Sequence, residues 1–516
     1  MDIPPAIGPI ERIIARYDAA KALRDQWQSN MQDCYTYAIP DRDLFTATAA
    51  GQKKGAELFD STAVAGVQEF ASRIQSSICP PWRQWSKLVP GAGLPKQYRE
   101  SDELALYLEE QTDILFDYIN HSNFALKSHE AFQDLAVGTG ALTVELNEQQ
   151  NGLVFDSVPP PQLGIEEGPT GMIETQFIDR CMKPVDIERL YPGAQLPEKW
   201  NKLKATKPAE KVEFCVASIF EPKRREYHLV VFSKTEKAVM YWRPLGETSP
   251  MIVFRWLSLP GETWGRGPVM AALPDIKTVN KVVEFTLRGA ALGLSPPFTA
   301  VNDGALNPYT VQVAPDAIIP VMSNDQANPT LRQLVVDSRP DLTQIVLEDL
   351  RRNIKRHLLN DTRRQEGPIQ SATEILVEQR DFVQLSGSGF GRVQTEFIER
   401  VLGRCVALLR SIGKMADFKV DGREVTLKHL SPLARAQDQE ELLSLQTAMA
   451  SIAPFGPEAV MLAFKTDKIG EWIAKKAGVD ASVLRTDGER DQMQKQLAAA
   501  AAAAAAAQQQ GAPATA

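Results

Sequence analysis

The most regular hydrophobic pattern in the chain lies between residues 265 and 410. Apolar residues recur at three- and four-residue steps over residues 268–294 and again over residues 341–359. Such steps place the apolar side chains along one stripe of a helix. A long stretch broken by prolines separates the two helical patterns, and an arginine-bearing segment follows the second. The pattern therefore predicts two long helices with a non-helical excursion between them, which suggests a rod with a projecting tip and not an active-site pocket.

The pattern changes from helical to alternating near residue 138. Helices are predicted over residues 9–37, 59–78, 102–120 and 125–137. Strands are predicted over residues 142–146, 153–157, 175–181, 212–220, 227–232, 238–242 and 252–256, with one short helix at 185–191. Most of the connections are short, so the strands are expected to be antiparallel. Further helices are predicted over residues 371–411, 438–453, 458–464 and 468–477, and the fold class is therefore α+β, mainly helical with a β-rich segment.

Glycines mark two places where the chain is expected to bend. Gly261, Gly265, Gly267 and Pro268 form a predicted hinge into the first central helix, since glycine permits tight turns and proline suits a first helical turn. A second group is expected to kink the helix over residues 371–411. Its members are Gly387, Gly389 and Gly391. This group superficially resembles a phosphate-binding loop, but its flanks are helical on both sides, which favours the kink.

Composition removes several classes of function. The chain has 516 residues, which by length predicts about three structural units, and no apolar run long enough to cross a membrane. Its five cysteines are dispersed without a CxxC pair, which indicates reduced thiols, and its five histidines are too scattered to form a local zinc site. No constellation of catalytic residues is apparent. We therefore expect no enzyme activity, no metal and no cofactor.

Charge is unevenly distributed in this acidic chain, whose net charge is −8. Residues 351–364 hold six basic residues against the single acid Asp361. Two interpretations are open. The bases could form a solvated helix face that pairs with nearby acids such as Glu348, Asp349 and Glu366. Alternatively they could form a positive loop that touches phosphate groups without reading sequence, because no base-reading motif is present.

The order and spacing of several short motifs resemble the head-to-tail connector, or portal, proteins of short-tailed (podovirus-type) bacteriophages. Each motif is weak alone, but together they extend over most of the chain. The motifs are Ala65-Gly66-Val67 with Ala71-Ser72-Arg73; Pro80-Pro81-Trp82-Arg83-Gln84-Trp85; Ser122-Asn123-Phe124 with Leu135 and Gly138; Gly261-Glu262-Thr263-Trp264-Gly265-Arg266-Gly267; Arg363 with Ser371-Ala372-Thr373-Glu374-Ile375; and Leu442 with Ala453-Pro454.

The resemblance implies a portal-type subunit that assembles into a ring, usually a dodecamer, at a unique capsid vertex of the virion. Mapped onto this chain, it implies the following parts: a wing (1–259) that is helical and then β-rich, a hinge with the first stem helix (260–294), a clip (295–338), a second stem helix (339–359), a tunnel loop (360–370), a long kinked wing helix (371–411), a crown (412–485), and a C-terminal barrel helix or flexible tail (486–516).

The same resemblance implies a DNA channel for genome packaging, retention and ejection, and for tail attachment. The implied partners are other copies of the chain, double-stranded DNA without sequence specificity, the terminase large subunit, scaffolding and major capsid proteins and a tail adaptor, with assembly in the host cytoplasm and no membrane. Lys355, Arg356, Arg363 and Arg364 are the expected DNA-contacting residues. An otherwise acidic channel would let DNA slide, because uniform basicity would trap it. A non-conducting capsid scaffold or adaptor is the alternative, with an enzyme acting on nucleic acid third.

Overall fold

The computed structural model describes residues 7–43, 45, 51, 53–81, 83–99, 101–294, 298–300, 331–333, 340–360, 389–416, 425–430 and 432–456, with isolated positions beyond 456. Internal contacts divide the chain into two units. Unit 1 comprises residues 1–27, 71–266 and 364–516, and unit 2 comprises residues 28–70 and 267–363. The predicted tunnel loop after Asn360, most of the clip, the helices expected at 458–464 and 468–477, and the C-terminal tail lie largely or wholly outside the described residues.

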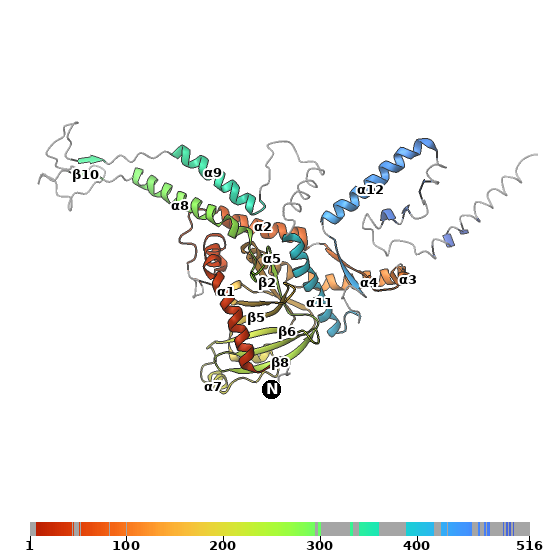
Figure 1. Ribbon diagram of the computed structural model, residues 1–516, viewed down its shortest axis with the longest axis horizontal. Helices are drawn as coiled ribbons and strands as arrows, with labels where there is room; N and C mark the ends of the chain where they lie inside the picture. The colour runs from red at the N-terminus through yellow and green to blue at the C-terminus, as the bar shows by residue number, and fades with distance from the viewer. Residues whose placement is uncertain are drawn as a thin grey trace, which may run out of the picture. The chain divides into compact units, whose positions relative to one another are not determined.

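A five-stranded antiparallel sheet forms one layer of unit 1 (Figure 1). Its strands, in spatial order, are β4 (Leu163–Glu167), β5 (Ile173–Met182), β6 (Val212–Glu221), β7 (Glu226–Ser233) and β8 (Ala238–Gly246). Helix α1 (Ile10–Ala38) packs on this sheet through Ile13, Tyr17 and Ala20, which share a buried cluster with Phe177 and Phe232. The sheet is therefore covered by the first helix of the chain, whose apolar stripe was visible in the sequence.

A second, three-stranded sheet has the order β3 (Leu153–Ser157), β2 (Thr139–Leu146), β9 (Met251–Arg255). The helices near it in unit 1 are α4 (Asp102–Asn120), α5 (Phe124–Val137) and α11 (Glu399–Ser411). Rings from these elements form a continuous aromatic core in which Phe397 lies 4.6 Å from Phe254 and 5.1 Å from Phe132, measured between ring centroids. This core connects a residue near position 400 to the β-rich segment that ends before position 260.

Three further elements of unit 1 join distant parts of the chain. Strand β1 (Ser86–Pro90) pairs antiparallel with β12 (Val425–His429), and α12 (Pro432–Ile452) follows β12. Helix α3 (Lys96–Arg99) lies between β1 and α4 in sequence, and the 3₁₀ turn η2 (Pro160–Gln162) precedes β4. Sequence analysis did not predict β1, β4 or β12, since these strands are short and β1 and β12 find their partners only through the fold.

Two helices separate β5 from β6, where the sequence predicted one. Helix α6 (Pro184–Leu190) corresponds to the expected helix at 185–191, but α7 (Glu198–Thr206) was missed. Trp200 is the buried residue of α7, so the helix presents almost no apolar stripe to a periodicity argument. The prediction of a single helix in this segment is therefore wrong, although the α+β class is confirmed.

Unit 2 is built around two long helices, α8 (Pro268–Leu294) and α9 (Pro340–His357), which pack side by side (Figure 1). The short strands β10 (Phe298–Ala300) and β11 (Leu331–Gln333) pair between them in sequence. The end of α1, the 3₁₀ turn η1 (Pro40–Arg42) and the start of α2 (Thr62–Ile78) complete the unit. Pro274 lies inside α8 without ending it. The two central helices predicted from hydrophobic period are thus present with nearly the expected bounds.

Candidate functional site

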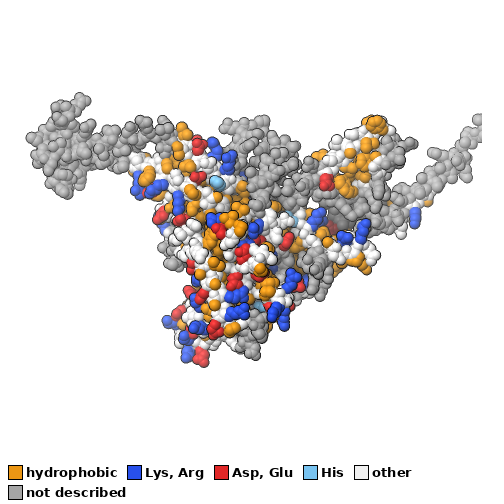
Figure 2. All heavy atoms as spheres, in the orientation of Figure 1, with side chains coloured by type: hydrophobic (Ala, Val, Ile, Leu, Met, Phe, Trp, Pro, Cys, Tyr) orange, Lys and Arg blue, Asp and Glu red, His pale blue; other side chains and the backbone are white. Residues whose placement is uncertain are grey.

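The α8–α9 pair has one apolar face that is buried and another that is exposed. Val269, Ala272, Ile276 and Val279 of α8, Leu347 and Ile354 of α9, and Leu358 just after α9 are buried. On other faces of the same helices, large apolar side chains keep more than half of their surface exposed to solvent. They are Phe285 (58%), Leu287 (55%), Ile345 (61%) and Val346 (51%). Figure 2 shows hydrophobic side chains among charged ones over α8. The pair therefore has large apolar side chains that packing within this chain leaves uncovered.

An ion pair and several hydrogen bonds connect α8 and α9 to residues 57–66, which also belong to unit 2. The guanidinium of Arg351 contacts Asp60, with Nη2 at 2.5 Å and Nε at 3.0 Å from Oδ2. Asn280 of α8 accepts a hydrogen bond from the backbone N–H of Phe59 and donates one to the carbonyl of Glu57. Burial raises the pKa of Asp60, but hydrogen bonds from Thr62 and Arg351 outweigh it and hold that pKa below its ordinary value. Arg351 is therefore a structural member of the basic cluster.

The remaining basic residues at the end of α9 behave differently. Arg352 pairs with Asp349 at 3.5 Å on an exposed surface, as the solvated-face interpretation expected. Lys355 and Arg356 are both exposed in the last turn of α9, where Figure 2 shows Lys and Arg side chains near a histidine. Arg363 and Arg364 lie outside the described residues. The structure thus anchors Arg351 and pairs Arg352, and the assignment of Lys355, Arg356, Arg363 and Arg364 to DNA stays a prediction.

The α9 helix ends in a tightly packed turn directly after this basic face. Asn360 is buried, its side-chain amide donates to the carbonyl of Gly66 at 2.9 Å, and its backbone N–H bonds to the carbonyl of Lys355. Leu358 packs so closely on Gly66 that a Cβ there would lie 2.5 Å from its Cδ1. The chain therefore leaves α9 from a defined position, which holds the exposed cations in place.

The glycines predicted as a hinge have distinct roles in the structure. Gly261 has φ +84° and so adopts a conformation that suits glycine. A Cβ on Gly265 would lie 2.3 Å from the carbonyl oxygen of Gly138, so this glycine permits a close backbone approach. Leu257 and Arg266 exchange backbone hydrogen bonds and close the loop on itself. The boundary between the two contact units falls before Gly267 and Pro268, the start of α8, and hinge motion there stays a prediction.

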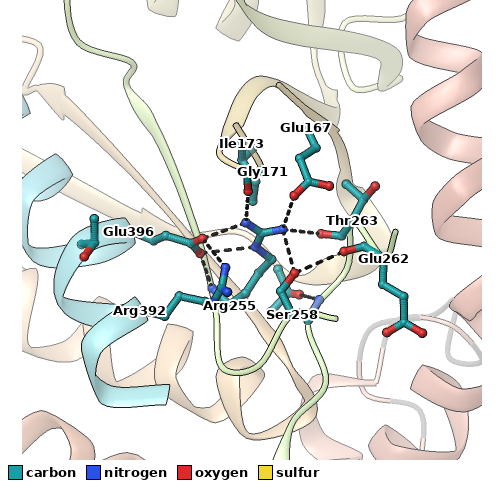
Figure 3. A network of polar contacts seen from close by, with 12 residues as sticks. Glu167, Gly171, Ile173, Arg255, Ser258, Glu262, Thr263, Arg392 and Glu396 are labelled. Atoms are coloured by element: carbon teal, nitrogen blue, oxygen red, sulfur yellow. Dashed lines mark hydrogen bonds and ion pairs between the residues drawn. The ribbon is translucent and has the colours of Figure 1, made fainter. Parts of the chain in front are cut away.

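A buried ion-pair cluster lies next to this loop, and sequence analysis did not find it (Figure 3). Arg255 at the end of β9 has a fully buried side chain, and its Nη2 contacts Glu396 Oε1 at 2.8 Å. The same guanidinium donates to the carbonyls of Gly171 (2.7 Å) and Thr263 (3.2 Å) and reaches Glu167 at 3.3 Å. Burial lowers the pKa of Arg255, but the hydrogen bonds and charges of Glu396 and Glu167 outweigh it and raise that pKa overall. We call Arg255, Glu396 and Glu167 the Arg255 cluster.

The Arg255 cluster joins the segment before α8 to the segment that returns after α9. Thr263 precedes α8 in sequence, whereas Glu396 follows α9, and both bind the one guanidinium. Glu396 lies in the π-helical turn η3 (Gln394–Ile398), and such turns often occur at functional sites. The chain leaves unit 1 after Thr263 and returns to it before Glu396. The cluster therefore connects the segment before α8 to the segment after α9, and both segments belong to unit 1. The sequence held one signal for this cluster. Glu396 is a charged residue between two apolar residues, Val393 and Phe397, that are both buried.

The glycines expected to kink the helix lie just before this π-helical turn. Gly389 and Gly391 are helical, and Gly387 lies outside the described residues. A Cβ on Gly389 would lie 2.7 Å from the indole of Trp256, whereas one on Gly391 would meet open space. Gly389 is thus required for close packing against Trp256, which directly follows β9. The irregularity in the described helix begins at Gln394, and a kink at the glycines themselves stays a prediction.

Membrane-crossing helices and clusters of metal ligands are both absent from the described part of the chain. None of its helices combines the length and the hydropathy that a membrane crossing requires. Among those same residues, no three His, Cys, Asp or Glu side chains come together as metal ligands would.

Comparison with known proteins gives three findings. Residues 11–484 match the family described as bacteriophage head to tail connecting protein. The portal protein of Escherichia phage T7 is 20% identical over 512 aligned residues, which cover 93% of this chain and 89% of that protein. A chain from the virion of a native gene transfer agent particle aligns with a TM-score of 0.33 at 12% identity, covering 76% of this chain and 86% of that one.

Proposed function

Because this chain belongs to the family of bacteriophage head-to-tail connecting proteins, we propose that its copies form a closed ring around a channel for double-stranded DNA at one capsid vertex. The family match over residues 11–484 is the observation that carries the connector function. In the proposed ring, α8 and α9 line or surround the channel as its stem, and the segment between them forms the rim that docks other proteins.

The exposed apolar residues of the α8–α9 pair support self-association. A helix pair packs one face within its own subunit, and a ring requires a second face for the neighbouring subunit. Phe285 and Leu287, two residues apart on α8, point to different sides of that helix, and with Ile345 and Val346 of α9 they supply exposed apolar side chains for a subunit that has a neighbour on each side. Burying a large apolar side chain contributes about 1.5–3 kcal/mol, so four of them repeated at every interface would provide a substantial share of the assembly energy.

The basic end of α9 supports passage of DNA without sequence recognition. Lys355 and Arg356 are exposed at the end of α9, in a chain whose net charge is −8. A few cations in an acidic channel give brief phosphate contacts and leave the duplex free to slide. The proposed contact set is Lys355, Arg356, Arg363 and Arg364.

Negative-stain microscopy and native mass measurement of the purified full chain test the ring. Closed dodecameric rings with a central hole are the expected result. Ile345→Lys should abolish rings, whereas Leu126→Lys, which changes an equally exposed residue of α5 (62%), should leave them intact. A uniform monomer for the unaltered chain would refute the ring and favour a non-conducting adaptor. Loss of rings in both variants would refute the specific part assigned to the α8–α9 pair.

Charge-neutralising variants test the DNA contacts separately from assembly. Lys355→Gln together with Arg356→Gln should reduce the amount of DNA packaged or retained while rings still form. Arg352→Gln is the matched control, because that arginine already pairs with Asp349. Equal packaging by the double variant and the control would contradict the contact set.

The remaining partners follow from the same proposal. A connector at a capsid vertex would dock the terminase large subunit during packaging, scaffolding and major capsid proteins during assembly, and a tail adaptor afterwards. Deletion of residues 295–338 should leave rings but abolish binding of the terminase or the adaptor, as measured by co-sedimentation with each purified protein. Unchanged binding of both would place the docking surface elsewhere.

A further inference from the structure

A buried arginine in unit 1, Arg404, has no acidic partner among the residues that the structure describes. Arg404 of α11 is only 4% exposed, and its guanidinium donates to the carbonyl of Val144 (3.5 Å) and to the carbonyl and hydroxyl of Thr248 (3.3 Å each). All three acceptors are neutral. Among the described residues, no carboxylate lies within 4 Å of this guanidinium. Buried charges in proteins are normally paired, because an unpaired charge loses its hydration without compensation.

A cavity of about 170 Å³ adjoins Arg404. Arg243 of β8 also lines it, and the Nε of Arg243 is buried without a hydrogen-bond partner in the described residues. The aromatic rings of Tyr191 and Tyr241, 5.5 Å apart, form another wall. The cavity is smaller than the roughly 300–1,000 Å³ of drug-sized ligand pockets, but holds several water molecules at about 30 Å³ each. It thus has room for one compact polar group.

The charges around the cavity leave a positive excess. Arg189 is neutralised by Glu148, whose Oε2 lies 2.6 Å from its Nη2. Arg404 and Arg243 then face Glu145 as the one remaining acid on the cavity wall. The pKa of Arg404 is lowered to about 10, chiefly by burial; the charge of Glu145 opposes this shift and the charge of Arg243 adds to it. The two arginines therefore repel each other across a site that one negative charge would neutralise.

We propose that this cavity binds a single anionic group, a carboxylate or a phosphate, between the guanidinium groups of Arg404 and Arg243. Arginine presents a planar fork of donors that suits both groups, and charge-assisted hydrogen bonds are stronger in a partly buried site. The group is either free phosphate or an acidic side chain of a different protein that docks on this face. The site does not depend on ring formation or on DNA passage.

Calorimetric titration of the purified full chain with inorganic phosphate and, separately, with glutarate tests the proposal. Saturable one-to-one binding of at least one anion is expected. Preference for phosphate would identify free phosphate as the ligand, and preference for glutarate would identify a protein carboxylate. Absence of saturable binding for both anions would overturn the proposal.

Three variants locate the binding. Arg243→Met should weaken the affinity roughly tenfold or more, the loss expected for a charge-assisted hydrogen bond. The matched control carries both Arg189→Met and Glu148→Gln, which removes an ion pair and leaves the net charge of the cavity wall unchanged, so it should bind as the unaltered chain does. Glu145→Gln should strengthen binding, which no general loss of folding would produce. Equal affinity of Arg243→Met and this control would place the anion outside this cavity.

Discussion

Replacement of Glu396 by glutamine tests the Arg255 cluster most directly. Glutamine has nearly the same shape and keeps an oxygen that can accept the backbone N–H of Arg255, now 2.9 Å from Glu396 Oε2. The substitution therefore removes the negative charge and leaves most of the packing. The guanidinium of Arg255 would remain fully buried, with Glu167 at 3.3 Å as its acidic partner.

The expected loss is large because both charged groups are out of water. The side chains of Arg255 and Glu396 are 0% and 2% exposed. Breaking such a pair from one side typically costs about 3–5 kcal/mol, because a buried charge is left uncompensated. Glu167 keeps part of the compensation, so we expect the lower end, about 3 kcal/mol in the free energy of unfolding. Most of this value is the cost of an orphaned arginine and not the net worth of the pair.

Urea unfolding followed by tryptophan fluorescence measures this loss. Trp256 and Trp264 lie close to Arg255 in sequence and are buried, so their emission should report the region. Arg392→Met is the matched control. It removes another partner of Glu396, at 3.2 Å, but one whose side chain is 33% exposed, and should cost less than about 1 kcal/mol.

A double variant separates the pair from its surroundings. Arg255→Met combined with Glu396→Gln should be less destabilised than the sum of the two single variants, since neither buried charge then lacks its partner. If Glu396→Gln lost no more stability than Arg392→Met, or if the two changes were simply additive, the Arg255 cluster would not clamp the segments before α8 and after α9.

Three further expectations follow from single positions. Gly389→Ala should cost about 1–3 kcal/mol of stability, because its Cβ would press into the Trp256 indole. Gly391→Ala is the control and should be neutral or stabilising, because alanine favours a helix. Equal unfolding midpoints of the two variants would contradict the packing of Gly389 on Trp256. Burial lowers the pKa of His429 to about 4 in the folded chain, whereas its pKa in the unfolded chain is near 6.5. The stability that the neutral imidazole contributes above pH 6.5 should therefore decline as the pH falls from 6.5 to about 4. A His429→Phe variant should not show that decline. Asp60 has a lowered pKa, so its contribution should be lost only below pH 3.8, and an Asp60→Asn variant measured over the same titration should lack this more acidic step.

The long elements could be predicted well because each carries its own apolar stripe. Helix α8 has the bounds that hydrophobic period predicted, and strands β3 and β6 differ from expectation by at most a residue. Periodicity works here because a helix or strand must bury one face whatever its neighbour is. The elements that were missed, β1 and α7 among them, are short or present little apolar surface, so their stability comes from partners that local sequence does not reveal.

The candidate sites, like the helices and strands, could be predicted from the sequence only in part. The excess of basic residues at 351–364 was evident from charge alone, but only the fold distinguishes Arg351, which binds Asp60, from the exposed Lys355. Arg404 could not be recognised at all, because an unpaired buried charge is a property of its surroundings and not of its spacing.

The sequence by itself determined the two central helices, the β-rich segment between helical parts and, through the order of its motifs, the connector family. Each depends on local patterns or on their order along the chain. Only the tertiary structure decided that Arg255 joins Thr263 to Glu396, that Gly389 lies against Trp256, and which apolar residues of α8 and α9 remain uncovered. These contacts join residues far apart in sequence, so hydrophobic period can mark their elements but cannot say which faces meet.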